Sequence, residues 1–196
     1  MNIHPNRRWT LAFTLVSLLL VTTSCKANLA TVPVLITKMP QAASSAPIPL
    51  DEQALENLEY TGIYDQAVQL SSGKYIGPPF EEGGASRPTV TLQGVTAGDL
   101  NQDGLDDAVV LLAENSGGSG TFIYLAAVLN NNGDLLNIST ISLGDRVRVQ
   151  SIQVVDGRIL VSLLAHAPED PLCCPTQKVE TTYLVDTGQL IPIENE

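Results

Sequence analysis

The chain has 196 residues, is 44% hydrophobic, and carries 21 Asp and Glu against 10 Lys and Arg, for a net charge of −11. Affinity for a phosphate backbone comes largely from clustered basic residues, and those present here are scattered along the chain. We therefore predict no nucleic-acid partner. An acidic surface attracts divalent cations, although a plain solvated surface is the simplest interpretation.

The first residues form a secretory signal. Arg7 and Arg8 precede an apolar run from Leu11 to Val21, and small residues follow up to Cys25. A helix needs roughly 20 apolar residues to span a bilayer, and this run is much shorter. We predict that residues 1–24 are a cleaved signal peptide and that the protein is exported.

Cys25 ends a stretch, Thr22-Thr23-Ser24-Cys25, that resembles the lipobox of bacterial lipoproteins. The resemblance implies that Cys25 becomes the lipidated first residue and anchors the protein to a membrane of the cell envelope. Thr22 stands where a lipobox usually has Leu or Val, and ordinary cleavage that leaves a thiol is the alternative. Lys26 replaces the Asp associated with inner-membrane retention, which favours the outer membrane, on its periplasmic side or at the surface.

Residues 25–50 contain four Pro and few charges, which is typical of a flexible tether. Residues 51–196 then suffice for one globular domain. Loss of residues 1–24 removes Arg7 and Arg8 and no acid, so eight basic residues face 21 acidic ones and the charge becomes −13.

The domain begins with a predicted short helix, in which Asp51 is the N-cap and Leu55 and Leu58 share one face. The rest of the chain alternates β-rich runs with turn residues. We predict strands in a hairpin over 67–77 and over 87–95, 107–113, 121–130, 135–143, 146–155, 158–166, 178–186 and 189–193. The run 107–113 is apolar enough to be central in its sheet.

The run 146–155 changes its apolar phase between Val149 and Ile152, which predicts a β-bulge near Ser151. Asp156-Gly157 after it is the strongest hairpin signal in the chain. We predict a mainly β, α+β domain with one short N-terminal helix. About nine strands would form an antiparallel meander, arranged as two layers or as a partly closed barrel.

The acidic stretch 98–107, GDLNQDGLDD, is the main candidate for a metal site. Ca²⁺ takes six to eight hard oxygen ligands, and alternate side chains of a curled loop can point to one centre. Gly104 permits the sharp turn. We predict a structural Ca²⁺ held by Asp99, Asn101, Asp103, the backbone carbonyl of Leu105, and Asp107. The alternative is a set of Asx turns without an ion.

This pattern differs from an EF-hand, because Val110 stands at the twelfth position in place of Glu and a strand follows in place of a helix. The pattern D-x-N-x-D-G-x-x-D before an apolar strand resembles the calcium loop of integrin-alpha, or FG-GAP, repeats. The resemblance implies Ca²⁺ bound by the five residues above. A propeller needs several copies, and this chain has one.

A second resemblance covers about residues 50–195. The stretches GDLNQDGLDDAVVLLAENSGGSGTF, LGDRV and DPLCCPTQ resemble a group of small exported bacterial proteins, often lipoproteins. These proteins have no assigned activity, so this resemblance implies export and leaves the function open.

Cys173 and Cys174 are neighbours, with Cα atoms about 3.8 Å apart, whereas disulfides usually join Cα atoms roughly 4.4–6.8 Å apart. A strained vicinal disulfide, free buried thiols, and a redox or soft-metal site are the three alternatives. His166 is the one His after residue 24, and one His with two Cys is a small ligand set for zinc or copper. We expect His166 to be bonded to the backbone at a strand end.

No catalytic constellation is evident. Residues 117–121, GGSGT, lack the final Gly of a nucleophile elbow and the Lys of a phosphate loop. We therefore predict a non-enzymatic binding or structural module with an unknown protein or glycan partner. The alternative is an exported hydrolase or thiol-redox accessory protein that uses Cys173 and Cys174 or His166. A deep cleft at these residues would favour the alternative, whereas a flat exposed sheet face would favour binding.

Overall fold

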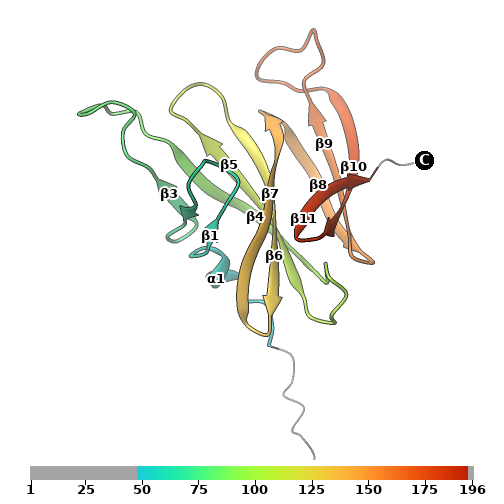
Figure 1. The fold of residues 1–196 in the computed structure, drawn as a ribbon. Coiled ribbons are helices and arrows are strands. Elements are labelled where there is room, and N and C mark those ends of the chain that lie inside the picture. The colour runs from blue at the N-terminus through green and yellow to red at the C-terminus, as the bar shows by residue number, and fades with distance from the viewer. Residues whose placement is uncertain (1–47, 194–196) are drawn as a thin grey trace, which may run out of the picture. The chain divides into compact units, whose positions relative to one another are not determined.

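The structure, a computed structural model, describes residues 48–193 (Figure 1). The predicted signal peptide, Cys25 and most of the predicted tether lie outside these residues. The described elements are α1 (Glu52–Leu55), β1 (Glu59–Tyr60), β2 (Val68–Gln69), β3 (Lys74–Ile76), β4 (Thr89–Gly98), β5 (Asp107–Asn115), β6 (Phe122–Asn131), β7 (Asp134–Asp145), β8 (Arg148–Val155), β9 (Arg158–Ala165), β10 (Gln177–Asp186) and β11 (Gln189–Ile193). Among them, no helix has the length and apolar character to cross a membrane.

The predicted fold class is confirmed: the domain is mainly β, with one short N-terminal helix. The Asp51 carboxylate caps this helix by accepting a hydrogen bond from the Gln53 N–H at 2.9 Å. Leu55 is fully buried. The Asp51 cap and the burial of Leu55 therefore hold this short helix in position.

Two antiparallel sheets form most of the domain. The central sheet has the order β3-β4-β5-β6-β7, and the C-terminal sheet has the order β11-β10-β9-β8. Within each sheet, strands that follow one another in the chain are paired, as expected for a meander. β5 is the middle strand of the central sheet and is largely buried, which confirms the prediction made from its apolar run.

Tight turns connect β2 to β3, β6 to β7, β8 to β9, and β10 to β11. Their two central residues have positive φ at Ser72-Gly73, Asn132-Gly133, Asp156-Gly157 and Thr187-Gly188. This backbone matches the right-handed twist of the flanking strands. The prediction that 67–77 is one hairpin is wrong in its pairing, because β2 pairs with β1 and β3 pairs with β4. The two flanks share the Ser71–Lys74 bridge at the turn and then pair with different strands, and Val68 packs in the same apolar cluster as Tyr75.

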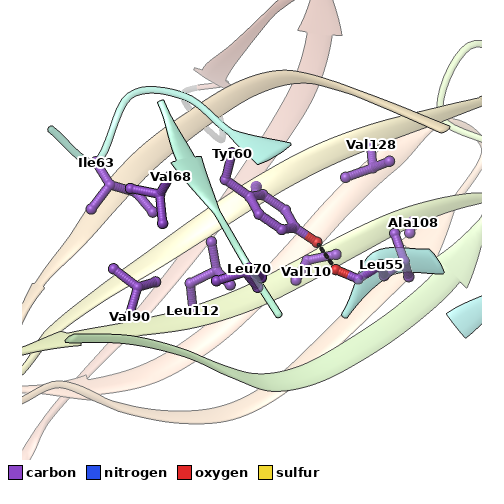
Figure 2. Close-up of a cluster of buried hydrophobic side chains, with 11 residues drawn as sticks. Leu55, Tyr60, Ile63, Val68, Leu70, Val90, Ala108, Val110, Leu112 and Val128 are labelled. Carbon is purple, nitrogen blue, oxygen red and sulfur yellow. Dashed lines mark hydrogen bonds between the residues drawn. The ribbon is translucent and has the colours of Figure 1, made fainter. Parts of the chain in front are cut away.

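The central sheet lies between two apolar clusters. On one face, α1 and the β1–β2 pair cover it with Leu55, Tyr60, Ile63, Val68 and Leu70, which pack on Val90, Ala108, Val110, Leu112, Ala126 and Val128 (Figure 2). On the other face, the C-terminal sheet covers it with Ile159, Val161, Leu163 and Leu190, which pack with Val109, Leu125 and Ala127. Eleven strands replace the predicted nine or so. β2 falls in the predicted hairpin 67–77, whereas β1, which has two residues and no alternating pattern, was not predicted.

Two local features bring the sheets together. The register of β8 against β9 shifts between Val149 and Ser151, which confirms the predicted bulge. The bulge places Val149, Ile152 and Val154 in the cluster that faces the central sheet. A Cβ on Gly98 would lie 2.5 Å from the Val154 Cβ, so the two sheets approach closely where β4 ends.

Candidate functional site

The acidic loop connects β4 to β5 and is curled by its own hydrogen bonds. The two carboxylate oxygens of Asp99 accept from the backbone N–H groups of Asp103 at 3.1 Å and Gly104 at 2.9 Å. Asn101 Oδ1 accepts from the same Asp103 N–H at 3.0 Å. Asp103 Oδ1 accepts from the Leu105 N–H at 2.8 Å, and its Oδ2 accepts from Asn101 Nδ2 at 2.9 Å. The loop thus brings together the oxygens of Asp99, Asn101 and Asp103.

Backbone conformation explains why these residue types occur here. Gln102 has φ of 62° and Gly104 has φ of 87°, both in the left-handed region. Gly adopts that region without a steric penalty, and Asp and Asn side chains close short turns by accepting backbone N–H groups. The curl of the loop is therefore set by its own sequence.

Asp107 occupies a different environment from the other three predicted side-chain ligands. It is fully buried at the start of β5. Its Oδ2 accepts from the Leu100 N–H at 2.8 Å, and its Oδ1 accepts from the Asn130 N–H at 2.8 Å. Burial raises the pKa of Asp107, the two N–H groups oppose that rise, and the Asp103 charge adds to it. Asp107 is thus a clamp between the acidic loop and the end of β6.

Asn130, which bonds to Asp107 through its backbone, also bonds to the acidic loop through its side chain. The sequence pattern gave no reason to expect this role. Its side-chain amide donates to the Asp106 carbonyl at 3.1 Å, and its Oδ1 accepts from the Gly133 N–H at 2.7 Å. It is 1% exposed, whereas its partners Asp106 and Gly133 are exposed, so it anchors two surface segments from within the domain. Asn130 belongs to the run Asn130-Asn131-Asn132, which reads as an ordinary turn in the sequence. The sequence therefore gives no sign that the Asn130 side chain is buried.

The loop has the donor chemistry of a calcium site. Carboxylate and amide oxygens are the ligands that Ca²⁺ prefers, and an oxygen that accepts one hydrogen bond keeps a second lone pair. Within residues 48–193, no three His, Cys, Asp or Glu side chains converge on a point where a metal ion could sit. The structure therefore groups Asp99, Asn101 and Asp103, and it shows both carboxylate oxygens of Asp107 accepting backbone N–H groups. The Ca²⁺ site stays a prediction.

Shallow depressions adjoin the loop on the C-terminal sheet. One lies between the loop and the β8–β9 turn, where Asp99 and Gln102 face Asp156 and Gly157. A second shares Gln102 and Asp156 with the first and extends to Leu160 and Thr182. A third continues from these two residues along the sheet and is lined by Ser151, Gln153, Leu160, Val161, Ser162, Glu180, Thr181 and Thr182. The three depressions form one continuous surface.

The cysteines and His166 lie at another place, around the loop between β9 and β10. Cys173 and Cys174 are joined by a disulfide. Asp170 closes the loop by accepting from the N–H groups of Ala167 and Thr176, each at 2.8 Å. These bonds lower the pKa of Asp170, and the bond from the Ala167 N–H has the largest effect.

His166 does not form the expected bond to the backbone. Both of its ring nitrogens are buried and have no hydrogen-bond partner among the described residues. The depression beside Cys173 is lined by Thr121, Ile123, Arg146, Val147, Arg148, Leu172 and Pro175, and His166 is not among them. The structure therefore does not place His166 and the cysteines in one cleft.

No protein-family model, curated protein or solved structure matches this chain. The two resemblances described from the sequence accordingly stay predictions, and function has to be argued from the geometry.

Proposed function

We propose that the protein is an exported envelope module, anchored through a lipid on Cys25, that binds a protein partner without catalysis. Binding would use the outer face of the C-terminal sheet, the face turned away from the central sheet. The observation that carries this proposal is the continuous surface from the acidic loop across β8, β9 and β10.

The outer face exposes apolar side chains among small polar ones. Val155 on β8, Leu160 on β9 and Ile191 on β11 expose 49%, 38% and 38% of their surface. Polar side chains border them, namely Ser151, Gln153, Ser162, Glu180 and Thr182. Leu160 is thus an apolar centre with a polar rim, an arrangement that interfaces between proteins share. The strand pairing places Leu160 between Gln153 and Thr182.

The acidic loop supports one end of this face. Gln102 Nε2 donates to the Asp156 carbonyl at 3.4 Å, so the loop touches the β8–β9 turn. A Ca²⁺ ion held by Asp99, Asn101, Asp103 and the Leu105 carbonyl would fix the loop against that turn. In this role the ion is structural, and typical extracellular calcium modules bind at roughly 10⁻⁴ to 10⁻³ M.

The alternative, a hydrolase or thiol-redox accessory protein, has less support. A nucleophile and its base need to lie within hydrogen-bond reach. His166 does not line the depression beside Cys173, and neither of its nitrogens has a partner within residues 48–193. A binding role needs no such constellation.

Site-specific photocrosslinking in intact cells tests the binding face. A photoreactive amino acid at Leu160 is expected to give a discrete adduct with one partner protein, because Leu160 is at the centre of the face. The matched control is Leu136, which is 56% exposed on β7 and lies outside the face. Adducts that are the same from both positions, or none from Leu160, would contradict the proposal. An adduct that glycosidases remove would replace the protein partner with a glycan.

A further inference from the structure

Aromatic side chains gather around one buried carboxyl group on the face of the central sheet that α1 covers. Strand pairing aligns Tyr75, Val90, Glu114 and Phe122 in one row across β3, β4, β5 and β6. Tyr124 lies opposite Leu112, which is two residues before Glu114 on the same face. Tyr64 reaches the row from the segment between β1 and β2. The outer face proposed above belongs to the other sheet, so this cluster is a separate feature.

Glu114 is 2% exposed, and its hydrogen bonds come from hydroxyl groups. The Tyr64 hydroxyl donates to Glu114 Oε1 at 2.8 Å, and the Ser116 hydroxyl donates to the same oxygen. Neither salt bridge of the described residues involves Glu114. A buried carboxylate without a positive partner is costly, because burial removes water without supplying a compensating charge.

A groove of about 390 Å³ has Tyr64, the hydrogen-bond partner of Glu114, in its wall. Its lining includes Tyr64, Asp65, Gln66, Tyr75, Phe80 and Pro88. No Lys or Arg lines it. Arg87, next to Pro88, instead donates to the Gly77 carbonyl at 3.3 Å. The groove therefore combines aromatic walls, the acid Asp65 on its border, and the buried Glu114 one hydrogen bond behind Tyr64.

We propose that this groove binds a weakly hydrated organic cation, namely a quaternary ammonium or a guanidinium group. The negative face of an aromatic ring attracts such a cation, and the attraction is stronger where water is excluded. Glu114 and Asp65 add charge complementarity. A strongly hydrated metal ion fits less well, because ring carbons cannot replace its oxygen ligands. The same chemistry serves a small cation, a lipid headgroup or an arginine of a partner.

Titrations followed by NMR test the groove on the full-length protein in a maltoside detergent. Choline and argininamide are the two cationic probes, and dimethylbutanol is the neutral isostere of choline. We expect at least one cation to produce saturable shifts at the amides of Tyr64, Asp65 and Tyr75, and the tighter probe identifies the class of cation. Saturable shifts from dimethylbutanol as large as those from the binding cation, or no saturable shift from either cation, would overturn the proposal.

Two variants separate charge from shape. Glu114→Gln keeps an oxygen that can accept from Tyr64 and is expected to weaken cation binding about tenfold. Tyr75→Leu removes one aromatic wall at the sheet edge and is expected to weaken binding several-fold. The amide spectrum of each variant shows whether it is folded. Unchanged cation affinity in both folded variants would contradict the assignment.

Discussion

Replacing Asp107 with alanine is expected to lower the free energy of unfolding by about 2–6 kcal/mol, even in the presence of a chelator. The carboxylate accepts the N–H groups of Leu100 and Asn130, each at 2.8 Å. Asp107 itself is fully buried. Each buried donor left without a partner costs about 1–3 kcal/mol. Urea unfolding gives the difference, provided that the slope with denaturant is unchanged.

The neighbouring residue supplies a matched control for this clamp. Asp106→Ala removes an equal charge from an exposed side chain and is expected to change stability by less than about 0.5 kcal/mol. Asp107→Asn keeps one acceptor but turns an NH₂ group toward one of the two N–H donors, so it should be clearly destabilising as well. Equal stability of Asp107→Ala and Asp106→Ala would show that Asp107 is not a clamp.

The second large effect is expected at Tyr60, where Tyr60→Ala should cost about 3–5 kcal/mol and Tyr60→Phe about 1 kcal/mol. The ring is fully buried between the β1–β2 pair and the central sheet (Figure 2). Its hydroxyl donates to the Leu55 carbonyl at 3.0 Å, which ties β1 to α1. Phe preserves the packing and loses that bond, whereas Ala leaves a cavity.

Thermal or urea unfolding of the two Tyr60 variants tests whether the N-terminal segment is a layer of the core. A large loss in Tyr60→Ala, together with a small one in Tyr60→Phe, is the expected pattern. If Tyr60→Ala were as stable as the natural chain, the segment before β3 would be peripheral and the central sheet would need no cover on that face.

The sequence predicted those parts of the fold that depend on local pattern. The Asp51 cap, the central position of β5, the bulge before Ser151 and the turn at Asp156-Gly157 all follow from spacing and turn chemistry. The pairing of β1 with β2 was missed, because its two residue pairs depend on burial of Tyr60 and Val68 against a distant sheet.

The candidate sites depend on long-range contacts to different degrees. Asp99, Asn101 and Asp103 are close in sequence, so their grouping could be anticipated from the loop pattern. Asp107 belongs to the same loop pattern, but its carboxylate accepts the N–H of Asn130 on β6. That bond requires β5 and β6 to be paired, so the loop pattern alone could not predict it. The groove beside Tyr64 was not anticipated, because its aromatic rings, those of Tyr64, Tyr75 and Phe80, come together only in the folded chain, and Glu114 joins Tyr64 from the distant strand β5.

Thermal unfolding in Ca²⁺ and in chelator tests the central claim that the acidic loop holds a calcium ion beside the outer face. With about 10 mM Ca²⁺ and a dissociation constant of roughly 0.1–1 mM, the ion should stabilise the domain by about 1.4–2.7 kcal/mol. The midpoint should then rise by several degrees, and Asp99→Asn/Asp103→Asn should abolish the rise while Asp106→Asn keeps it. A midpoint that is the same in Ca²⁺ and in chelator would contradict the account.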